Sequence, residues 1–312
     1  MAIYTRIQTS DIRKIVSPYG IEVLDFTPIE GGNTNSNYHI RAKKGEYMLT
    51  IMEDKSLQEV QKFANLLHWL GTHNFVTSLV HATVTGELIT QYDSKPIMIK
   101  NWVLGKVHER FTADMLTQIG SSMAQLHQIP APAYLPKIHA YGLQVFSSVI
   151  GKKLDVKYEY WLEGQLKSIM KNIPNNLPRG LIHGDIFFDN VLFDRGNLKA
   201  IIDFEEACNY YLIFDVGMGI LGLCRTDGKI DLTKARALIK GYEQIRSFEV
   251  LEKEYLQFFI EYAATATSWW RFWKYNIESN RSNSKDKHWE MVQVAKEVEA
   301  MNKEQFSSFV FK

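Results

Sequence analysis

Hydrophobic positions alternate with polar ones through the first hundred residues and recur at helical spacing after them. The runs VLDFTPI, NYHIRA and EYMLTIM, within residues 23–52, have the two-residue period and glycine-containing breaks of antiparallel strands. Residues 57–70 repeat apolar side chains at helical spacing, and an amphipathic stretch at residues 10–20 precedes the first strand. Further strands are expected within residues 79–103, at LVHATV, ELITQY and KPIMIKNWV. The pattern therefore predicts a small antiparallel sheet interrupted by one helix.

Beyond Gly105 the periodicity is mainly helical, as in MLTQIGSSMAQLHQI, YEYWLEGQLKSIM, LTKARALIKGYEQI and YLQFFIEYAATATSWWRFWKY. A short apolar strand meets Gly105 with no long linker, so we place the boundary between an N-terminal lobe, residues 1–103, and a larger helical lobe, residues 104–312. The fold class is α+β with two lobes. A ligand site is expected between them.

Composition excludes several classes of function. The 312 residues include 36 Lys and Arg against 35 Asp and Glu, and no stretch concentrates basic residues, which argues against a nucleic-acid-binding protein. No apolar run has the length of a membrane helix, so no membrane association is expected. The polar N-terminal segment and the low cysteine content predict a cytoplasmic protein, with Cys208 and Cys224 as buried, unpaired side chains.

The candidate chemistry lies in LIHGDIFFDNVLF, residues 181–193, which reads as strand, turn and strand. Asp185 and Asn190 lie in the turn, and a following hairpin ends at Asp203, so three oxygen-bearing side chains are expected to converge. Such oxygen ligands suit Mg²⁺. If Asn190 and Asp203 bind the metal, Asp185 is left to accept a proton from a substrate hydroxyl. The alternative is that these residues only cap and turn the backbone.

The order HGD, then Asn, then IDFE after a hairpin resembles the motif of the aminoglycoside phosphotransferase and choline kinase superfamily, relatives of protein kinases. Most of the chain is similar to the homoserine kinase branch, through EGGNTNSNYHI, YMLTIME, LPRGLIHGDIFFDNVLF, IIDFEEACNYYLIFDVG and ATSWWRFW. The resemblance implies a bilobal protein-kinase-like fold that uses ATP and Mg²⁺. It implies Asp185 as catalytic base and Asn190 and Asp203 as Mg²⁺ ligands. It further implies that Asp215 braces the catalytic loop and that His183 holds it.

Residues 30–37 form the expected loop over the ATP phosphates, because glycines and small polar residues let backbone amides approach phosphate closely. Its nucleotide-binding candidates are Gly31, Gly32, Asn33, Thr34, Asn35, Ser36 and Asn37. Kinase-like folds usually carry a Lys on the third strand, where this chain has Thr50, and Glu59 at the helix start has no obvious cationic partner. The missing Lys leaves open what neutralises the phosphates, and a non-catalytic pseudokinase is an alternative. By the same resemblance Asn101 and Val103 belong to the hinge that binds adenine.

The acceptor is predicted from residues near Asp203 and from SWWRFWKY. Glu205 or Glu206 would bind the ammonium of an amino acid and Arg271 its carboxylate, whereas Trp270 and its neighbours would suit the quaternary ammonium of choline. Tryptophans at this spacing are also typical of helix packing, and Arg271 could have a structural carboxylate partner. Acidic and basic residues are nearly balanced over residues 205–275, which argues against a polycationic aminoglycoside. Homoserine is the first choice of acceptor, with choline or ethanolamine and aminoglycosides as alternatives. The protein is expected to be a monomer or homodimer.

Overall fold

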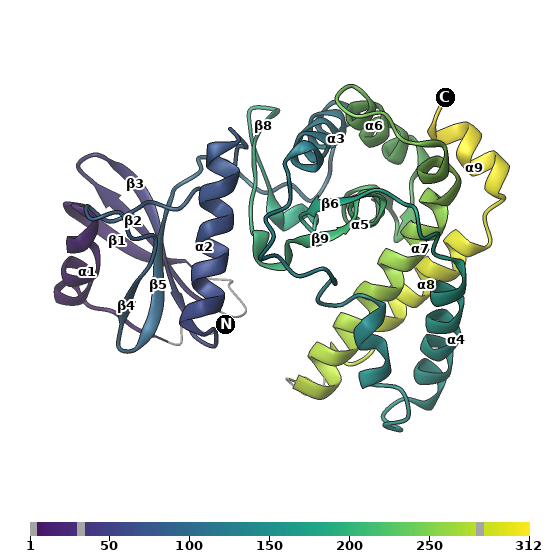
Figure 1. Cartoon of the computed structure of the whole chain (residues 1–312), viewed down its shortest axis with the longest axis horizontal. Helices are drawn as coiled ribbons and strands as arrows, with labels where there is room; N and C mark the ends of the chain where they lie inside the picture. Colours follow the sequence, from purple (N-terminus) through teal and green to yellow (C-terminus); the bar gives the residue numbers. More distant parts are fainter. Residues whose placement is uncertain (1–4, 30–34, 279–283) are drawn as a thin grey trace. The chain divides into compact units, whose positions relative to one another are not determined.

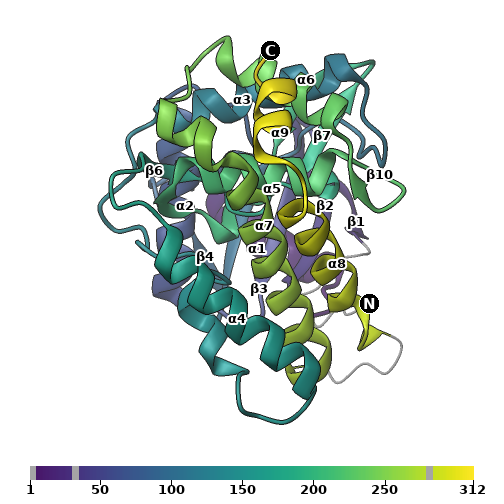
Figure 2. The ribbon, with the colours of Figure 1, turned by 90° about the vertical axis from the view of Figure 1, so that its right-hand side faces the viewer.

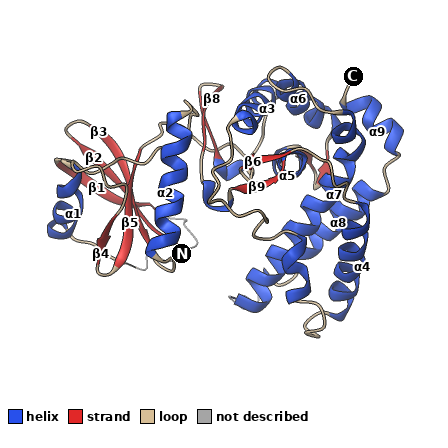
Figure 3. Ribbon diagram, in the orientation of Figure 1, coloured by secondary structure: helices blue, strands red, loops and turns tan. Residues whose placement is uncertain are grey.

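The computed structural model describes residues 5–29, 35–278 and 284–312, and the chain divides into two compact units. The smaller unit comprises residues 1–106 and 199–205, and the larger unit comprises residues 107–198 and 206–312 (Figure 1). Strands dominate the smaller unit and helices the larger one (Figure 3). This division of secondary structure confirms the predicted α+β class, with an antiparallel sheet near the N-terminus and a mainly helical remainder.

The smaller unit is built on one five-stranded sheet in the order β1-β2-β3-β5-β4, with every neighbouring pair antiparallel. Its strands are β1 (Val23–Ile29), β2 (Asn35–Ala42), β3 (Gly45–Met52), β4 (Thr90–Tyr92) and β5 (Lys95–Asn101). Two helices, α1 (Thr9–Val16) and α2 (Leu57–Thr72), accompany the sheet, and the turn Ser17–Tyr19 follows α1. In Figure 1 the two helices lie on opposite faces of the sheet.

One strand prediction in this unit is wrong, and another is too long. Residues 79–84 form no strand, since only an isolated bridge joins Val80 to Lys100, and ELITQY is extended only over β4. The N–H of Thr83 bonds to the carbonyl of Glu87 (2.8 Å), and that of Val84 bonds to Pro18 (2.9 Å). The segment therefore pairs with β5 only over residues 79–81, where it bonds to Ile99 and Asn101, and it leaves the sheet at Thr83 although its residues alternate in the manner of a strand.

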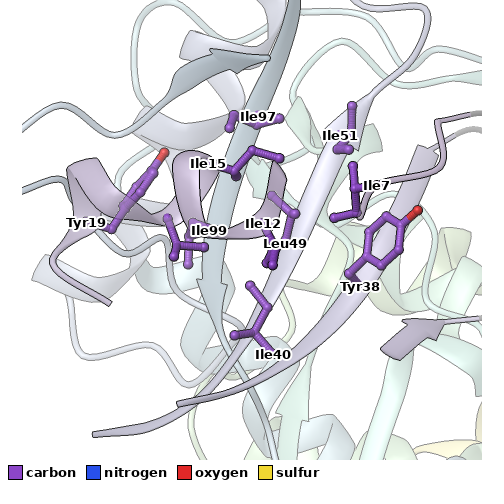
Figure 4. Close-up of a cluster of buried hydrophobic side chains, with 11 residues drawn as sticks. Ile7, Ile12, Ile15, Tyr19, Tyr38, Ile40, Leu49, Ile51, Ile97 and Ile99 are labelled. Carbon is purple, nitrogen blue, oxygen red and sulfur yellow. The ribbon is translucent and has the colours of Figure 1, made fainter. Parts of the chain in front are cut away.

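One cluster of buried hydrophobic side chains in the smaller unit lies on the α1 face of the sheet (Figure 4). The cluster consists of Ile7, Ile12, Ile15, Val16, Tyr19, Tyr38, Ile40, Leu49, Ile51, Ile97 and Ile99. Because successive side chains of a strand point to opposite faces, Thr50, Met98 and Lys100 lie on the other face. The start of α2 is capped reciprocally by Ser56 and Glu59. Glu59, for which the sequence suggested no cationic partner, thus serves as a helix cap.

The larger unit contains the helices predicted after residue 105 and others that the periodicity did not single out. Its α-helices are α3 (Ala113–Gln128), α4 (Val156–Asn172), α5 (Leu212–Leu223), α6 (Leu232–Glu243), α7 (Val250–Phe272), α8 (Lys287–Glu299) and α9 (Lys303–Val310). Shorter helical turns are Leu143–Ser148, Phe188–Asn190, Phe204–Glu206 and the π-helical Trp273–Glu278, which continues α7. Figure 2 shows α8 running beside α7.

Short pairs of strands lie in the segments that connect these helices. They are β6 (Arg179–Ile182) with β9 (Cys208–Tyr211), β7 (Val191–Asp194) with β8 (Asn197–Ile201), and β10 (Arg225–Thr226) with β11 (Lys229–Ile230). The predicted hairpin before Asp203 is therefore present as β7 and β8, and β8 ends two residues before Asp203.

The two cysteines agree with their prediction as buried, unpaired side chains. Burial raises the pKa of the thiols of both Cys208 and Cys224, so neither is a reactive thiolate near neutral pH. Across the described part of the chain, no helix combines the length and the apolarity needed to cross a membrane.

Candidate active site

The loop that follows β6 is fixed by the buried carboxylate of Asp215 at the start of α5. The backbone N–H groups of His183 and Gly184 donate to its two oxygens, at 3.1 and 2.7 Å, and His127 Nε2 donates to Oδ2 at 3.0 Å. Burial of Asp215 would raise its pKa, but the hydrogen bond from His127 and the nearby positive charge hold the pKa below its usual value. The loop is therefore tied to an ionised carboxylate in the interior of the larger unit.

Gly184 has no substitute in this loop, because its φ is +85° and its surroundings leave no room for a side chain. A Cβ atom there would lie 2.8 Å from His139 Nε2 and 2.9 Å from the carbonyl oxygen of Glu206. His139 is fully buried, and burial lowers its pKa to about 4, so the neutral ring donates from Nε2 to the carbonyl of Gly184 (3.0 Å). Glycine in HGD thus lets the chain pass between two packed groups.

Asp185 comes next, and its half-buried carboxylate is held by a residue that the sequence did not single out. The hydroxyl of Tyr141 donates to Asp185 Oδ1 at 2.7 Å, and the backbone N–H of Asp185 donates to His183 Nδ1 at 3.2 Å. Asn190 Nδ2 donates to the backbone carbonyl of Asp185 (2.9 Å) and lies 3.5 Å from Oδ2. The larger unit therefore brings His183, Asp185 and Asn190 together, with Asp215 beneath them.

Asp203 belongs to the smaller unit, where it follows β8 in an uncommon conformation. Its φ is +68°, in the left-handed region that residues other than glycine seldom adopt. Backbone strain of this kind persists where the surrounding structure enforces it, often at functional sites. Two residues later, Glu205 forms an ion pair with Lys55 and accepts a hydrogen bond from Asn35 Nδ2 at 2.9 Å. Glu205 is thus engaged within the smaller unit.

The proposed nucleotide-binding residues are described only in part, since Gly31, Gly32, Asn33 and Thr34 lie outside the described residues. Asn35, Ser36 and Asn37 begin β2. Thr50 faces Asn37 across β2 and β3 and donates to Asn37 Oδ1 at 2.8 Å. At the end of β5, the N–H of Asn101 bonds to the carbonyl of Leu79 and its carbonyl accepts from Ser78, each at 2.8 Å. The backbone of Asn101 is thus occupied by protein contacts, whereas Val103 lies beyond the strand.

Of the remaining acceptor candidates, Trp270 and Arg271 lie near the end of α7. Glu206 is the last residue of the turn Phe204–Glu206 and the only one of its three residues that belongs to the larger unit. The ring of Trp270 lies 6.5 Å, centroid to centroid, from that of Tyr141, which bonds to Asp185. Arg271 Nη1 donates to Glu290 Oε2 at 2.6 Å, and Glu290 also pairs with Arg225. Arg271 therefore has a structural carboxylate partner. Trp270 lies next to Tyr141, the residue whose hydroxyl bonds to Asp185.

Comparison with known proteins identifies a family model and relatives that match this chain. Residues 25–248 match the model of the phosphotransferase enzyme family (APH). A homoserine kinase of Pseudomonas aeruginosa is 28% identical over 280 residues, covering 88% of this chain and 87% of that protein. One of Caulobacter vibrioides is 30% identical over 266 residues, covering 82% and 84%.

Solved structures agree on the fold. An amicoumacin kinase in complex with AMP-PNP and Ca²⁺ superposes with a TM-score of 0.73 at 12% identity, covering 96% of this chain and 97% of its own. A spectinomycin phosphotransferase in complex with ADP and spectinomycin gives a TM-score of 0.64 at 16% identity, covering 98% of each chain. Matches of this kind indicate a small-molecule kinase with a kinase-like fold. From the match over residues 25–248 and from its relatives, this chain belongs to the phosphotransferase enzyme family (APH).

Proposed function

We propose that this protein transfers the γ-phosphoryl group of ATP, with Mg²⁺, to the side-chain hydroxyl of homoserine. The observation that carries the proposal is the carboxylate of Asp185, half-buried, bonded by Tyr141 and set on a loop tied to Asp215. Homoserine is favoured as acceptor because the relatives above, which this chain matches over most of its length, are homoserine kinases. A cytoplasmic location and a monomer or homodimer stay predictions from the sequence.

Asp185 is the proposed catalytic base. Its carboxylate takes the proton of the acceptor hydroxyl while the hydroxyl oxygen forms a bond to the γ-phosphorus. The bond between that phosphorus and the bridging oxygen breaks, and ADP leaves with the electron pair. Tyr141 restricts rotation of the carboxylate through its bond to Oδ1. His183 and Asp215 hold the loop and do not act on the substrate.

Asn190 and Asp203 are the proposed Mg²⁺ ligands. Carboxylate and amide oxygens suit this cation, and the left-handed backbone of Asp203 is the kind of conformation that functional sites retain. When bound, Mg²⁺ neutralises charge on the phosphates of ATP. Asn190 presents its amide nitrogen to Asp185, which leaves its amide oxygen to a ligand.

For ATP itself we propose the loop at residues 31–37, Thr50 on β3, and the hinge residues Asn101 and Val103. Because Leu79 and Ser78 occupy the backbone of Asn101, we assign the adenine contact to Val103 in preference. The hydroxyl of Thr50 is already bonded to Asn37, and an uncharged hydroxyl cannot replace the charge of a lysine. Thr50 therefore does not supply the positive charge of the missing lysine.

Trp270, beside Tyr141, is the proposed wall of the acceptor pocket. Glu206 and Arg271 are the proposed partners of the ammonium and carboxylate of homoserine, with Glu205 a weaker candidate because Lys55 neutralises it. A second candidate acceptor is choline or ethanolamine. It is favoured by the aromatic rings of Tyr141 and Trp270 near Asp185 and by the engagement of Arg271 with Glu290.

The test is ADP release from Mg-ATP with L-homoserine, choline, ethanolamine or an aminoglycoside as acceptor. We expect turnover with homoserine well above that with the other acceptors. Turnover with choline or ethanolamine instead would contradict the acceptor and leave the reaction intact. Binding of ATP without turnover on any acceptor would favour the pseudokinase alternative.

Arg271→Ala tests recognition of the acceptor carboxylate, and Arg225→Ala is its matched control. Both arginines bond Glu290 at 2.6 Å, so both variants remove one ion pair of the same carboxylate. If Arg271 also binds the acceptor, Arg271→Ala raises the KM for homoserine about 10-fold or more, the worth of a charge-assisted hydrogen bond. Arg225→Ala should leave that KM unchanged. Equal effects of the two variants would assign Arg271 a structural role alone.

A further inference from the structure

The third strand of the sheet lacks the lysine that kinase-like folds use against the ATP phosphates, and β5 places another lysine beside that position. In the register of β3 and β5, Thr50 lies opposite Met98 and Met48 lies opposite Lys100. These two pairs are consecutive on one face of the sheet, the face away from the α1 core. Lys100 is therefore a diagonal neighbour of Thr50 with its side chain on the same side.

The surroundings of Lys100 are acidic and come from the segment that carries the proposed metal ligand. Asp203 and Glu205 both attract its ammonium group electrostatically, and Lys55 repels it. The ring of Phe63 on α2 lies 6.0 Å from Nζ of Lys100 and 6.0 Å from Nζ of Lys55. Two lysines and two acids thus share this corner of the smaller unit.

The two lysines differ in whether their ammonium group already forms an ion pair. Lys55 forms an ion pair with Glu205, and about a third of its side chain is exposed. Lys100 forms no ion pair with the residues that the structure describes, and burial lowers its pKa although Asp203 and Glu205 oppose this effect. A half-buried ammonium group without a close anion is unfavourable unless a ligand completes its environment. Of the two, Lys100 has the charge available for an anionic ligand.

We propose that Lys100, reaching from β5, supplies the positive charge that binds the ATP phosphates in place of the lysine missing at Thr50. The inference rests on the proposed function, since it assumes that ATP binds this face of the sheet. With Mg²⁺ on Asp203 and Lys55 on Glu205, the ammonium of Lys100 donates to phosphate oxygens. Lys100 is then a phosphate-binding residue that leaves adenine recognition unaffected.

The experiment measures nucleotide affinity in the full chain without acceptor, by calorimetry with Mg-AMP-PNP and separately with adenosine. Lys100→Met should weaken AMP-PNP binding about 10- to 100-fold, the worth of one charge-assisted hydrogen bond, and leave adenosine affinity unchanged. Lys100→Gln, a polar neutral replacement, should repeat this result. Lys100→Arg keeps the charge and should retain most of the affinity.

Two further variants control for charge and place. Lys44→Met removes one exposed lysine from the turn before β3 and should not change either affinity. Thr50→Lys combined with Lys100→Met returns the charge to the usual third-strand position and should recover part of the AMP-PNP affinity. Thermal unfolding of Lys100→Met should not shift to lower temperature, since the substitution removes a half-buried charge.

The outcomes separate the inference from the function on which it rests. Folded native protein that binds neither Mg-AMP-PNP nor Mg-ATP would contradict the proposed function. Native binding that Lys100→Met and Lys100→Gln leave intact would overturn the role of Lys100 alone. Equal weakening of AMP-PNP and adenosine would also overturn it, because the substitution would then have disturbed the whole nucleotide site.

Discussion

Replacing Asp185 with asparagine should lower kcat for homoserine phosphorylation about 10²- to 10⁴-fold, the usual contribution of a general base. The amide has the shape of the carboxylate, but it cannot take the hydroxyl proton. ATP binding uses other residues, so the KM for ATP should stay within about 3-fold of the native value, as expected when an interaction made only in the transition state is lost. Steady-state kinetics with L-homoserine and varied ATP measure both quantities.

Tyr141→Phe tests the support of the same carboxylate and should have a smaller effect than Asp185→Asn. It removes the 2.7 Å hydrogen bond to Asp185 Oδ1 and leaves the base in place, so kcat should fall by about 10-fold, much less than in Asp185→Asn. Neither variant should lower the unfolding temperature enough to account for its lost activity. Native kcat in Asp185→Asn would remove this residue from the chemistry, and native kcat in Tyr141→Phe would reduce the tyrosine to packing.

Asp215→Ala should have the largest effect on stability among the site residues. Asp215 is fully buried, and its loss leaves His127 and the N–H groups of His183 and Gly184 without their acceptor. Each buried donor left without an acceptor costs about 1–3 kcal/mol, so the variant should lose about 3 kcal/mol or more of unfolding free energy. Urea denaturation of native and variant protein at pH 7 measures the difference, and a loss below about 1 kcal/mol would contradict it.

The difference in free energy of unfolding between native protein and Asp215→Ala should depend on pH, because Asp215 is a titratable group. Because the pKa of Asp215 is lower in the folded protein than its ordinary 3.8, the stability it contributes is fully present above about pH 4. That contribution is lost as the pH falls below this value toward the folded-state pKa. The free energies of unfolding of native protein and Asp215→Ala should therefore become more similar only below about pH 4.

Glu252→Ala is the matched control for Asp215→Ala. Glu252 is another fully buried acid of the larger unit, and it is paired with Arg246 at 2.9 Å and away from the catalytic loop. Both variants should be destabilised, but only Asp215→Ala should lose activity in the fraction that remains folded. Equal activity per folded molecule in the two variants would show that Asp215 supports the fold without positioning Asp185.

The local part of this fold could be read from the chain, because each element depends on neighbours in sequence. The alternation over VLDFTPI predicts β1 within its own bounds, and the apolar spacing over residues 57–70 predicts α2 to within two residues of its end. The order HGD, Asn and IDFE likewise points to a phosphotransferase without any coordinates, because spacing and residue type are both local. Residues 79–84 show the limit of this reasoning, since they alternate like a strand but bond to β5 only at Leu79 and His81, whereas Thr83 and Val84 bond to Glu87 and Pro18.

What only the tertiary structure decided are contacts between residues far apart in sequence. Tyr141 reaches Asp185 across 44 residues and His127 reaches Asp215 across 88, and no period or motif links either pair. Arg271 meets Glu290 rather than open solvent, and Lys100 lies beside Thr50 only because β5 pairs with β3. The division of the hairpin between the two units, with Asp203 in the smaller and Asp185 in the larger, likewise follows from packing. Sequence by itself determined most of the elements and the kind of chemistry, because period and motif are local. The supports of the catalytic groups depend instead on which distant side chains the folded chain brings into contact.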